Sequence, residues 1–425
     1  MPYIAEKNLE KCRQCGFCDE ISCSSRYVGY AEECTGCGAC SLACPYEAIQ
    51  MIEIQNGKSI SITVDGAIIS VPEKVTVKKA LEMCGYEPCE FPGDGNLFSP
   101  CRTGGCWSCA VLVNGELRPC CVTAVKEGMN ISTRPEVTPK RPVHGWMGHA
   151  VGGVGTPWRL KKLSGFIETA CFTCGCNFQC AQCQNWTSTY NGREIALTPR
   201  EAALLMSASR RNYRVDRMAI SGGECTLNRK WLIEYLRELK KKNTDAKARF
   251  HVDTNGSILT PDYLDELVEA GMTDIGIDLK SLDLNTFLHI TGVNNQEIAR
   301  KYLETAWNAV KYIVDNYPEK VFLGVGIPYN KDLISLEEIQ KMGDKIRKID
   351  ENVQVCVLDY RPAFRRLCIQ RPEYEEMENV WKILSGTGLK TVICQTARGH
   401  YGVNKPLENS IKFEVLLLPI LFLTN

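Results

Sequence analysis

Cysteine is the feature that most restricts what this chain can fold into. Twenty-four of its 425 residues are cysteine, and twenty of these fall in three groups, at 12–44, 84–121 and 171–183. Such a content is typical either of a secreted disulfide scaffold or of an intracellular metal protein. Here the cysteines are closely spaced, as in CxxC, where neighbouring thiols make poor disulfide geometry but good metal cages. The spacing therefore predicts a metal protein with several sites.

Charge and hydropathy restrict the class further. Fifty basic residues balance fifty acidic ones, so no large field of one sign is expected to bind nucleic acid. The N-terminus, MPYIAEKNLEKC, lacks the apolar core of a signal peptide, which favours a cytoplasmic protein. No membrane span is expected, because no window approaches the roughly 20 apolar residues that a span needs. The apolar tail VLLLPILFLTN is short and contains Pro419, and we expect a packed terminal strand or a docking segment there.

The hydrophobic pattern changes near residue 160. Before it, RPVHGWMGHAVGGVGTPW (141–158) is rich in Gly and Pro and is predicted to connect two parts of the chain. After it, strand-like runs alternate with helical ones, which is typical of parallel βα units whose chemistry sits at the carboxyl ends of the strands. Thr198-Pro199 and Thr260-Pro261 each predict a helix N-cap followed by a first-turn proline. The expected strands are 217–223, 249–256, 274–280, 321–329 and 353–360, and the expected helices include 228–242, 260–271 and 297–317.

The first cysteine group contains CRQCGFCDEISC (12–23) and CTGCGACSLACP (34–45). The second of these is the CxxCxxCxxxCP run of four-iron ferredoxins. The pair resembles a two-cluster bacterial ferredoxin over about 45 residues. The resemblance implies that one [4Fe–4S] cluster is held by Cys12, Cys15, Cys18 and Cys44, and a second by Cys34, Cys37, Cys40 and Cys23. The four-residue gap before Cys23 departs from the pattern, and a pair of four-cysteine zinc sites is the alternative.

The second group follows a stretch, 60–82, that predicts an alternating hairpin and then a helix. The C-x4-C-x2-C spacing of plant-type two-iron ferredoxins occurs at Cys101, Cys106 and Cys109. This region resembles the ferredoxin domain of succinate dehydrogenase iron–sulfur subunits, including an Asn114-Gly115 turn. The resemblance implies that Cys121 is the fourth ligand, with the adjacent Cys120 as the alternative. A single-iron site with four cysteine ligands remains open as well.

The third group, CFTCGCNFQCAQCQNW (171–186), contains CxxxCxxC. Three thiolates at this spacing can hold three irons of a cubane and leave the fourth iron open for a substrate, as open metal positions do. Together with motifs further along, residues from about 165 to 400 resemble the radical S-adenosylmethionine (SAM) superfamily. The resemblance implies a [4Fe–4S] cluster that binds SAM and is held by Cys176, Cys180 and Cys183. The other early cysteines are expected to be ordinary or redox-idle thiols: Cys84, Cys89, Cys171 and Cys174.

The downstream motifs carry this resemblance. Gly222, Gly223 and Glu224 lie where the family's GGE motif binds the SAM amino group. DTNG (253–256), DLK (278–280) and HITG (289–292) look like pyruvate formate-lyase activating enzyme and its relatives. The resemblance implies that a monovalent or divalent cation beside SAM is bound by Asp253, Thr254, Asp278 and the Gly276 carbonyl. Such oxygen ligands suit a hard cation. It also implies that Lys280 pairs with the SAM carboxylate and that Trp186 lies near the adenine.

Several positions depart from the family pattern. Cys225 follows GGE where the family usually has proline, and Gln182 precedes the last cluster cysteine where an aromatic residue is frequent. The additional cysteine groups precede the CxxxCxxC loop, whereas related activating enzymes insert theirs after it. RPAFRR (361–366) is expected near the mouth of the barrel, where its arginines either clamp a carboxylate, a phosphate or an acidic peptide, or form a solvated surface run.

These patterns predict an α/β chain: a partial (β/α)6 TIM-type radical SAM barrel preceded by two small α+β iron–sulfur domains. The expected division is a two-cluster ferredoxin domain at 1–55, a [2Fe–2S] domain at 58–135, a linker at 136–160, the barrel at 161–400 and a tail at 401–425. We expect three [4Fe–4S] clusters, one [2Fe–2S] cluster, SAM and an external electron donor.

Three functions are compatible with this division. The first is reductive cleavage of SAM to a 5′-deoxyadenosyl radical that takes hydrogen from a protein partner, as an activase of the glycyl-radical type. The second is the same chemistry on a small molecule, a peptide or a cofactor precursor. The third is electron transfer without SAM chemistry. In the first two, the ferredoxin domains relay electrons to the radical SAM cluster.

Overall fold

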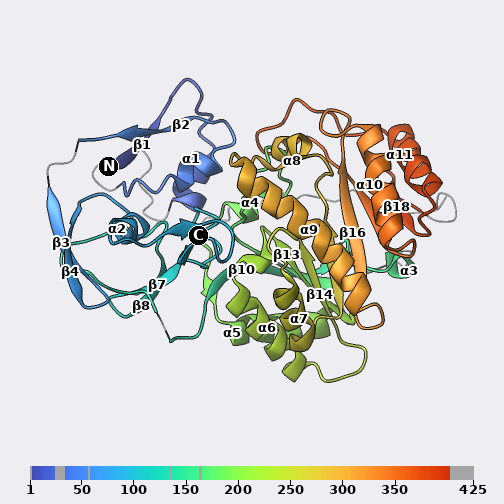
Figure 1. Cartoon of the computed structure of the whole chain (residues 1–425), viewed down its shortest axis with the longest axis horizontal. Coiled ribbons are helices and arrows are strands. Elements are labelled where there is room, and N and C mark those ends of the chain that lie inside the picture. The colour runs from blue at the N-terminus through green and yellow to red at the C-terminus, as the bar shows by residue number, and fades with distance from the viewer. Residues whose placement is uncertain (1, 24–33, 56–57, 135, 162–164, 403–425) are drawn as a thin grey trace.

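The computed structural model describes residues 2–23, 34–55, 58–134, 136–161 and 165–402. In Figure 1 the N-terminal elements, drawn in blue, lie beside a larger unit of strands and helices that extends to the red C-terminal helices. Within these ranges, no helix is both long enough and apolar enough to cross a membrane. The apolar tail, for which a packed strand or a docking segment was expected, lies outside the described residues.

The first N-terminal unit is small. Strand β1 (Tyr3–Lys7) pairs antiparallel with β2 (Ile49–Glu53), and one π-helical turn, Cys18–Ser22, and helix α1 (Ala39–Ala43) lie between them in the chain. Its core contains a few small or apolar side chains, such as Ala5 and Ile49, together with several cysteines. So few buried apolar groups give little hydrophobic stabilisation, and a unit of this size usually needs disulfides or metal.

The second unit is a five-stranded sheet with the order β4 (Ala67–Pro72), β3 (Ser59–Val64), β9 (Asn130–Ser132), β7 (Ala110–Val113), β8 (Glu116–Pro119). Helix α2 (Val77–Met83) follows the first hairpin, and β5 (Pro88–Cys89) pairs with β6 (Leu97–Phe98). The hairpin and helix predicted over 60–82 are therefore present. The predicted Asn114-Gly115 turn is confirmed, since both residues have positive φ between paired residues of β7 and β8. This is the turn that Asn-Gly favours.

The large unit is built on one ten-stranded sheet. Its strands, in spatial order, are β12 (Ala196–Leu197), β10 (Arg141–His149), β11 (Glu168–Thr173), β13 (Arg217–Gly222), β14 (Arg249–Thr254), β15 (Asp274–Asp278), β16 (Phe322–Tyr329), β17 (Gln354–Asp359), β18 (Val392–Thr396) and β19 (Gly399–Tyr401). Neighbours from β11 to β18 are parallel, whereas β10, β12 and β19 are antiparallel to their neighbours.

Helices connect the parallel strands. They are α3 (Trp158–Lys161), α4 (Trp186–Thr189), α5 (Pro199–Tyr213), α6 (Arg229–Lys242), α7 (Pro261–Ala270), α8 (Leu284–Thr291), α9 (Gln296–Asn316), α10 (Leu336–Ile349) and α11 (Tyr374–Gly386). Each parallel strand from β11 to β17 is followed by a helix before the next one begins, which confirms the partial barrel. Thr198 caps α5 by accepting from the Glu201 amide, and Pro199 and Pro261 begin their helices, as predicted.

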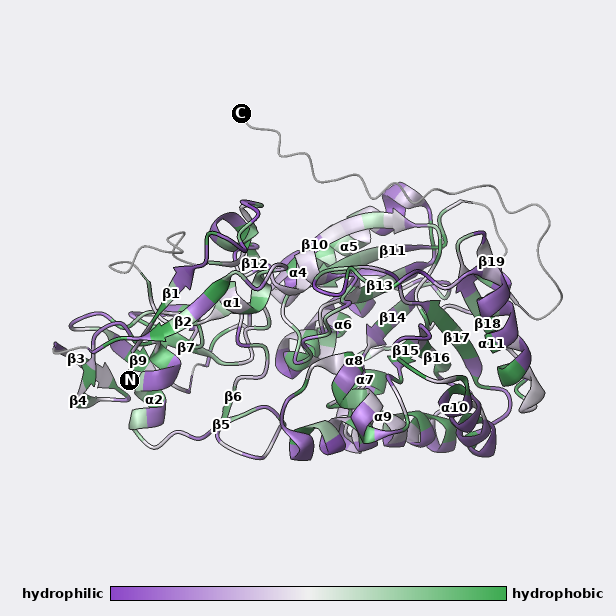
Figure 2. Cartoon of the chain, turned by 90° about the horizontal axis from the view of Figure 1, so that it is seen from above, coloured by the Kyte–Doolittle hydropathy of each residue, from purple (hydrophilic) through white to green (hydrophobic). Residues whose placement is uncertain are grey.

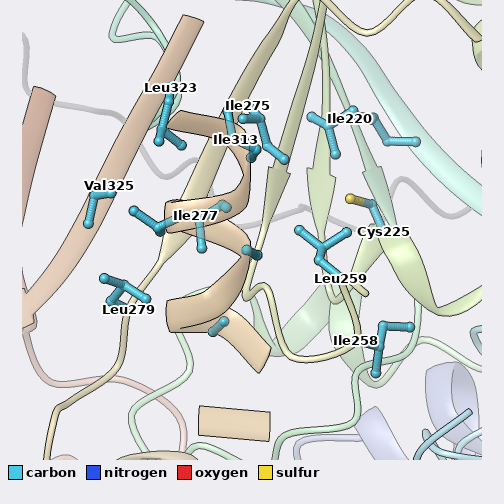
Figure 3. Packing of buried hydrophobic residues seen from close by; sticks show 14 of the residues in the cluster. Ile220, Cys225, Ile258, Leu259, Ile275, Ile277, Leu279, Ile313, Leu323 and Val325 are labelled. Carbon is cyan, nitrogen blue, oxygen red and sulfur yellow. The ribbon is translucent and has the colours of Figure 1, made fainter. Parts of the chain in front are cut away.

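The core lies between the sheet and these helices. In Figure 3, Ile275 and Ile277 of β15 and Leu323 and Val325 of β16 point into the same apolar cluster as Ile313 of α9. Figure 2 shows β16 and β17 largely in the green of hydrophobic residues. Parallel strands covered by helices are buried on both faces and are therefore apolar almost throughout. Burying one such side chain contributes roughly 1.5–3 kcal/mol.

The segment expected to connect two domains is instead part of the large sheet. Val143 of β10 is paired with Thr173 of β11, and the pairing shifts register between Gly145 and Met147. At this bulge Gly145 and Trp146 have positive φ. A bulge inserts an extra residue and favours glycine, which obscures the alternating pattern of a strand in the sequence. The structure thus differs from the expected linker over 141–149.

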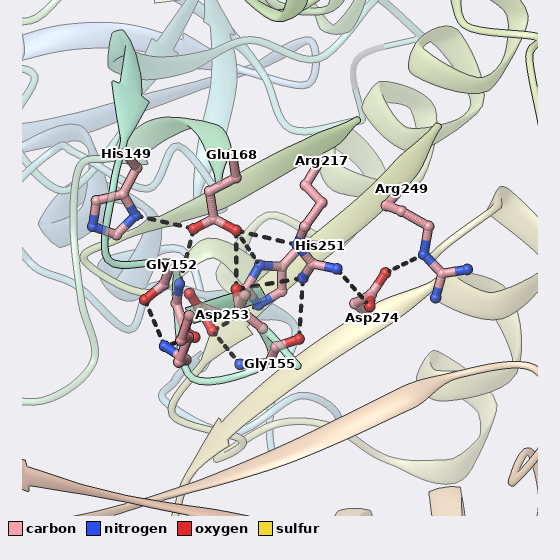
Figure 4. A network of polar contacts seen from close by, with 12 residues as sticks. His149, Gly152, Gly155, Glu168, Arg217, Arg249, His251, Asp253 and Asp274 are labelled. Carbon is pink, nitrogen blue, oxygen red and sulfur yellow. Dashed lines mark hydrogen bonds and ion pairs between the residues drawn. The ribbon is translucent and has the colours of Figure 1, made fainter. Parts of the chain in front are cut away.

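Buried charged groups close the amino end of the sheet (Figure 4). Glu168 and Arg217 begin β11 and β13, and Asp274 begins β15. His251 Nδ1 lies 3.1 Å from Glu168 Oε2, and its Nε2 lies 3.0 Å from Asp253 Oδ1. Arg217 Nη1 donates to Asp274 Oδ1 at 2.8 Å. Because buried charges without partners are strongly destabilising, this network is a structural requirement of the barrel.

The network predicts a specific dependence of stability on pH. Although burial alone would lower it, the carboxylates of Asp253 and Glu168 raise the pKa of His251 from 6.5 to about 9. Its stabilising contribution is therefore fully present below pH 6.5 and is lost as pH rises to about 9, a change of about 3 kcal/mol. We expect His251→Gln to remove this loss from the free energy of unfolding, measured by anaerobic denaturant titration between pH 6.5 and 9.

His289→Gln is the matched control. Burial lowers the pKa of His289, so this side chain loses no stabilising charge as pH rises through that range, and its removal should leave the slope nearly unchanged. Parallel stability curves for wild type and His251→Gln would contradict the assignment.

Candidate functional site

The CxxxCxxC loop begins where β11 ends. Its cysteines Cys176, Cys180 and Cys183 lie close enough for the charges of Cys180 and Cys183 to raise the pKa of Cys176, in addition to the larger effect of burial. Burial likewise raises the pKa of Cys180, to about 12. The backbone holds the loop, because the Gln179 amide donates to the Thr291 carbonyl at 2.7 Å. Iron binds cysteine as thiolate, so cluster assembly must displace these thiol protons.

The GGE turn packs directly on this loop. Gly222 has φ of 113°, and a Cβ on Gly222 would collide with the backbone of Thr173. A Cβ on Gly223 would collide with the Gly175 carbonyl, the same carbonyl that accepts from the Glu224 amide at 2.8 Å. Only glycine allows such close backbone approach. The two glycines therefore join the carboxyl ends of β11 and β13.

Glu224 connects GGE to the DTNG motif. Its side chain is buried and accepts from the Thr226 amide and hydroxyl, from the Thr254 hydroxyl at 2.6 Å and from the Asn255 amide at 2.7 Å. A carboxylate with this many donors is held in one orientation. Its charge also contributes to the raised pKa of Cys176, after burial, which places it near the cysteine loop.

Lys280 brings a buried positive charge to the same place. Its Nζ lies 2.9 Å from Asp278 Oδ2 and 3.0 Å from the Tyr360 hydroxyl. Burial alone would lower the pKa of Lys280, but Asp278 raises it well above its ordinary value, so the ammonium stays charged. The same charge acts to lower the pKa of Cys180, which places Lys280 beside the cysteine loop. An ammonium in this position suits an anionic group of a ligand.

The expected cation ligands have separate partners. Asp253 contacts His251 and accepts from the Gly155 amide, Thr254 donates to Glu224, and Asp278 contacts Lys280. In the described part of the chain, no three Asp, Glu, His or Cys side chains converge on the position of one metal ion. The cation site implied by the resemblance has only two carboxylates, beside a hydroxyl and a carbonyl, and it stays a prediction. A cubane needs its cysteines farther apart than the ligands of one ion, because each cysteine binds a different iron.

Trp186, expected near an adenine, is packed among aromatic rings. Its ring stacks on Phe364 with centroids 5.4 Å apart and lies 4.6 Å from the ring of Phe17. Phe17 belongs to the ferredoxin unit, so Trp186 lies at the contact between that unit and the barrel.

The cysteines expected to hold the first ferredoxin cluster surround a cavity of about 250 Å³. Its lining includes Cys12, Cys15, Cys18 and Cys44. These are the thiols that the ferredoxin resemblance assigns to one cluster, and they come from both ends of the first cysteine group. A space walled by four thiols fits an iron–sulfur cluster.

The second set also comes together, although the spacing before Cys23 departs from the pattern. The charges of Cys23 and Cys34 both act on Cys37 and on Cys40, whose pKa values burial raises. The extra residue is absorbed by the π-helical turn at 18–22, in which the Cys23 amide donates to the Cys18 carbonyl at 2.9 Å. Such single π turns insert one residue into a helix. The departure in spacing therefore does not move Cys23 away from the site.

The [2Fe–2S] cysteines form one buried cluster. Hydrogen-bond contacts from Cys106 and Cys121 lower the pKa of Cys101, and contacts from Cys120 and Cys121 lower that of Cys109. Cys121 thus contacts both Cys101 and Cys109, whereas Cys120 contacts Cys109. This difference favours Cys121 as the fourth ligand.

The [2Fe–2S] loop is docked on the barrel. A Cβ on Gly105 would lie 2.5 Å from the Gly175 amide nitrogen, and one on Gly175 would lie 2.5 Å from that of Cys106. Asn228 donates to the Cys106 carbonyl at 3.2 Å. The two iron–sulfur loops are therefore in backbone contact at the residue before Cys176.

Arg141 is a site residue that the sequence did not reveal. Its guanidinium is buried and donates to the carbonyls of Glu224, Cys225 and Cys174 at 2.5, 2.5 and 3.2 Å. It thereby ties the GGE turn to the cysteine loop. A basic residue that opens a glycine-rich strand is a weak signal, since its partners are backbone carbonyls more than 30 residues away.

Two arginines of RPAFRR donate hydrogen bonds to other parts of the chain. Arg365 donates to carbonyls of α1 and to that of Cys44, and Arg366 donates to the Gln182 side chain at 3.0 Å. These contacts support neither a free anion clamp nor a solvated run for this pair.

Comparison with known proteins identifies the domains. Residues 171–341 match the radical SAM superfamily, 57–136 a 2Fe-2S iron-sulfur cluster binding domain and 27–50 a 4Fe-4S binding domain. The chain contains a radical SAM domain. This confirms the predicted superfamily resemblance and the two predicted types of iron–sulfur domain. The domain boundaries, the number of clusters and their individual ligands stay predictions.

The relatives that this chain matches have different names. A protein of Thermoplasma volcanium named as a GTP 3′,8-cyclase is 30% identical over 210 residues, 47% of this chain and 62% of the relative. A protein of Methanocaldococcus jannaschii named as a glycyl-radical enzyme activating enzyme is 33% identical over 183 residues, 43% of this chain and 65% of the relative. The match thus spans less than two thirds of either relative. The structure of Streptococcus suis SuiB bound to S-adenosylmethionine has 15% identity and a TM-score of 0.35, covering 52% of this chain and 43% of SuiB.

The contacts of Cys121 predict the outcome of two serine substitutions. Cys121→Ser should abolish the [2Fe–2S] signal in visible circular dichroism and lower the iron and sulfide content, because one of the four expected thiolate ligands is lost. Cys120→Ser is the matched control: it removes a neighbouring buried thiol and should keep the cluster. Loss of the signal in Cys120→Ser alone would assign the ligand to Cys120.

Proposed function

We propose that this chain is a radical SAM enzyme that cleaves SAM reductively at the cluster held by Cys176, Cys180 and Cys183, with its ferredoxin domains relaying the electron. The observation that carries the proposal is the convergence of the cysteine loop, Glu224 and Lys280 at the carboxyl ends of β11, β13 and β15. When bound, the reduced cluster and SAM supply a 5′-deoxyadenosyl radical that takes a hydrogen atom from the substrate.

Each motif has a role in binding the amino acid part of SAM. The GGE turn, closed by Gly222 and Gly223 on the cysteine loop, presents backbone groups and Glu224 to the SAM amino group. Lys280 pairs with the SAM carboxylate, while Asp278 keeps it charged and oriented. The ligand's ammonium and carboxylate would thus each meet an opposite charge. Preorganised charges of this kind cost little reorganisation on binding.

The protein is proposed to work in a reducing compartment, the cytoplasm, because its many buried cysteines serve as thiolate ligands. An external one-electron donor would load the ferredoxin-type clusters, of which we propose two, and the [2Fe–2S] cluster. The close contacts of both iron–sulfur units with the barrel support a relay within the chain.

The proposed substrate is a protein partner, activated as a glycyl-radical enzyme is. The M. jannaschii relative's name supports it, as does the resemblance of DTNG, DLK and HITG to activating enzymes. The names of other relatives support a second candidate, a nucleotide or other small molecule. Under the first candidate a protein partner accelerates SAM cleavage, and under the second a nucleotide or other small molecule does.

A SAM cleavage assay tests the proposal. We expect the reconstituted, reduced protein to release 5′-deoxyadenosine from SAM, and Cys183→Ala to abolish this release because one cluster ligand is lost. Cys174→Ala, which removes a buried thiol in the same loop, should retain it. No release by wild type would refute the proposal. Faster release with GTP, and no glycyl radical in a candidate protein partner by electron paramagnetic resonance (EPR), would favour the second candidate.

Lys280 supplies a second test that does not depend on turnover. Lys280→Met should weaken SAM binding to the oxidised, cluster-loaded protein on the order of 10- to 100-fold, since a hydrogen bond to a charged group is lost. Isothermal titration under anaerobic conditions measures this change. Lys331→Met, at an exposed lysine, is the control. An unchanged affinity for SAM in Lys280→Met would show that Lys280 does not bind SAM.

A further inference from the structure

Residues 364–366 join the radical SAM loop to the ferredoxin unit. The backbone amides of Arg365 and Arg366 both donate to the Ala181 carbonyl at 2.9 Å. Ala181 follows Cys180 directly and lies two residues before Cys183. The backbone of this segment is thereby fixed on the radical SAM loop between two of its three cluster cysteines.

The side chain of Arg365 extends to the ferredoxin unit. Its Nε donates to the Cys44 carbonyl at 3.0 Å, and its Nη2 donates to the carbonyls of Ser41 and Leu42 at 2.8 and 3.0 Å. These carbonyls lie at the end of α1, where a helix leaves its last acceptors without partners. The planar guanidinium with its fixed donors suits several carbonyls at once. One residue therefore contacts both the radical SAM loop and the chain at Cys44.

Aromatic rings fill the space beside this contact. Phe364 stacks on Tyr190 and on Trp186, with centroids 5.1 and 5.4 Å apart. Trp186 in turn contacts Phe17, which directly precedes Cys18. The pKa of Tyr190 is raised first by burial and then by the charges of Cys183, Cys180 and Cys176, so this ring lies near all three radical SAM cysteines.

We propose that Arg365 is the positioning residue through which the ferredoxin cluster of Cys12, Cys15, Cys18 and Cys44 is held against the radical SAM cluster as its immediate electron donor. The inference rests on the proposed function and names the route of its electron. With both clusters bound, the transfer of one electron would oxidise the cluster held by Cys12, Cys15, Cys18 and Cys44 by one unit and reduce the cluster held by Cys176, Cys180 and Cys183 by one unit. An external low-potential donor then replaces the electron.

Two ligand segments of this cluster meet the radical SAM unit, which favours it over the [2Fe–2S] site. The segment at Cys44 meets Arg365, and the segment at Cys18 meets Trp186 through Phe17. The [2Fe–2S] loop instead meets the barrel through Gly105 and Gly175, ahead of Cys176. Each contact holds one ligand segment of this cluster against the radical SAM unit, so packing sets the separation of the two partners.

The test compares Arg365→Met with wild type as cluster-loaded full-length chains. Mixing with a reduced flavodoxin, a one-electron donor too large to enter the barrel, and freeze-quench EPR give the rate at which the radical SAM cluster is reduced. We expect Arg365→Met to lower this rate on the order of tenfold or more, because loss of a charge-assisted hydrogen bond changes an equilibrium by about this factor. The spin–spin interaction between the two reduced clusters should weaken as well.

Three controls separate positioning from folding. Arg361→Met alters an arginine of the same segment that lies 4.0 Å from Asp359, and should leave rate and spectrum unchanged. Arg365→Lys, which keeps the charge, should restore part of the rate. Iron content, the unfolding midpoint and SAM binding should stay close to wild type in every variant.

An unchanged rate and spin–spin interaction in Arg365→Met would overturn the proposal, and so would slow reduction in Arg361→Met alone. Failure of the proposed function has a different signature: wild type itself would release no 5′-deoxyadenosine, while the reduction of its clusters could still be measured.

Discussion

The site depends on the close approach of three backbone segments at Gly175. The Gly175 carbonyl accepts from the Glu224 amide at 2.8 Å, and Gly223 approaches it so closely that no Cβ would fit. On its other side Gly105 of the [2Fe–2S] loop contacts its amide. A side chain at any of these glycines would separate the cysteine loop from GGE or from the second iron–sulfur unit. The distance between these parts is thus set by backbone packing, which is stiffer than side-chain contact.

Arginines reinforce this arrangement from two directions. Arg141 binds carbonyls of the GGE turn and the cysteine loop from beneath, and Arg365 binds carbonyls of the ferredoxin helix. In both cases the partners are backbone acceptors that secondary structure leaves unused, and burial of such groups without donors is costly. Arginine supplies several donors in a rigid plane, so one side chain satisfies segments from distant parts of the chain.

These long-range contacts explain what the sequence could and could not predict. The alternation of strands and helices and the cysteine motifs are local patterns, and the superfamily, cluster types and parallel sheet followed from them. Strand β10 was hidden because its bulge disrupts the alternation. Arg141 was missed, and the partners of Arg365 in the RPAFRR run were not foreseen, since nothing near these arginines in sequence indicates their carbonyl partners. Motif order likewise does not indicate that His251 and Glu224 are the hydrogen-bond partners of Asp253 and Thr254.

The buried charges at the two ends of the sheet are balanced in different ways. At the amino end, buried charges such as Arg217 and Asp274 satisfy one another, so this end needs no ligand to neutralise them. At the carboxyl end, Lys280 and Glu224 face thiols whose pKa values burial raises, a costly arrangement that bound iron and SAM would relieve. The ferredoxin unit, with its small core, depends still more on its metal. The carbonyls that Arg365 binds belong to this unit, so the contact between the ferredoxin unit and the barrel depends on the same metal-held fold.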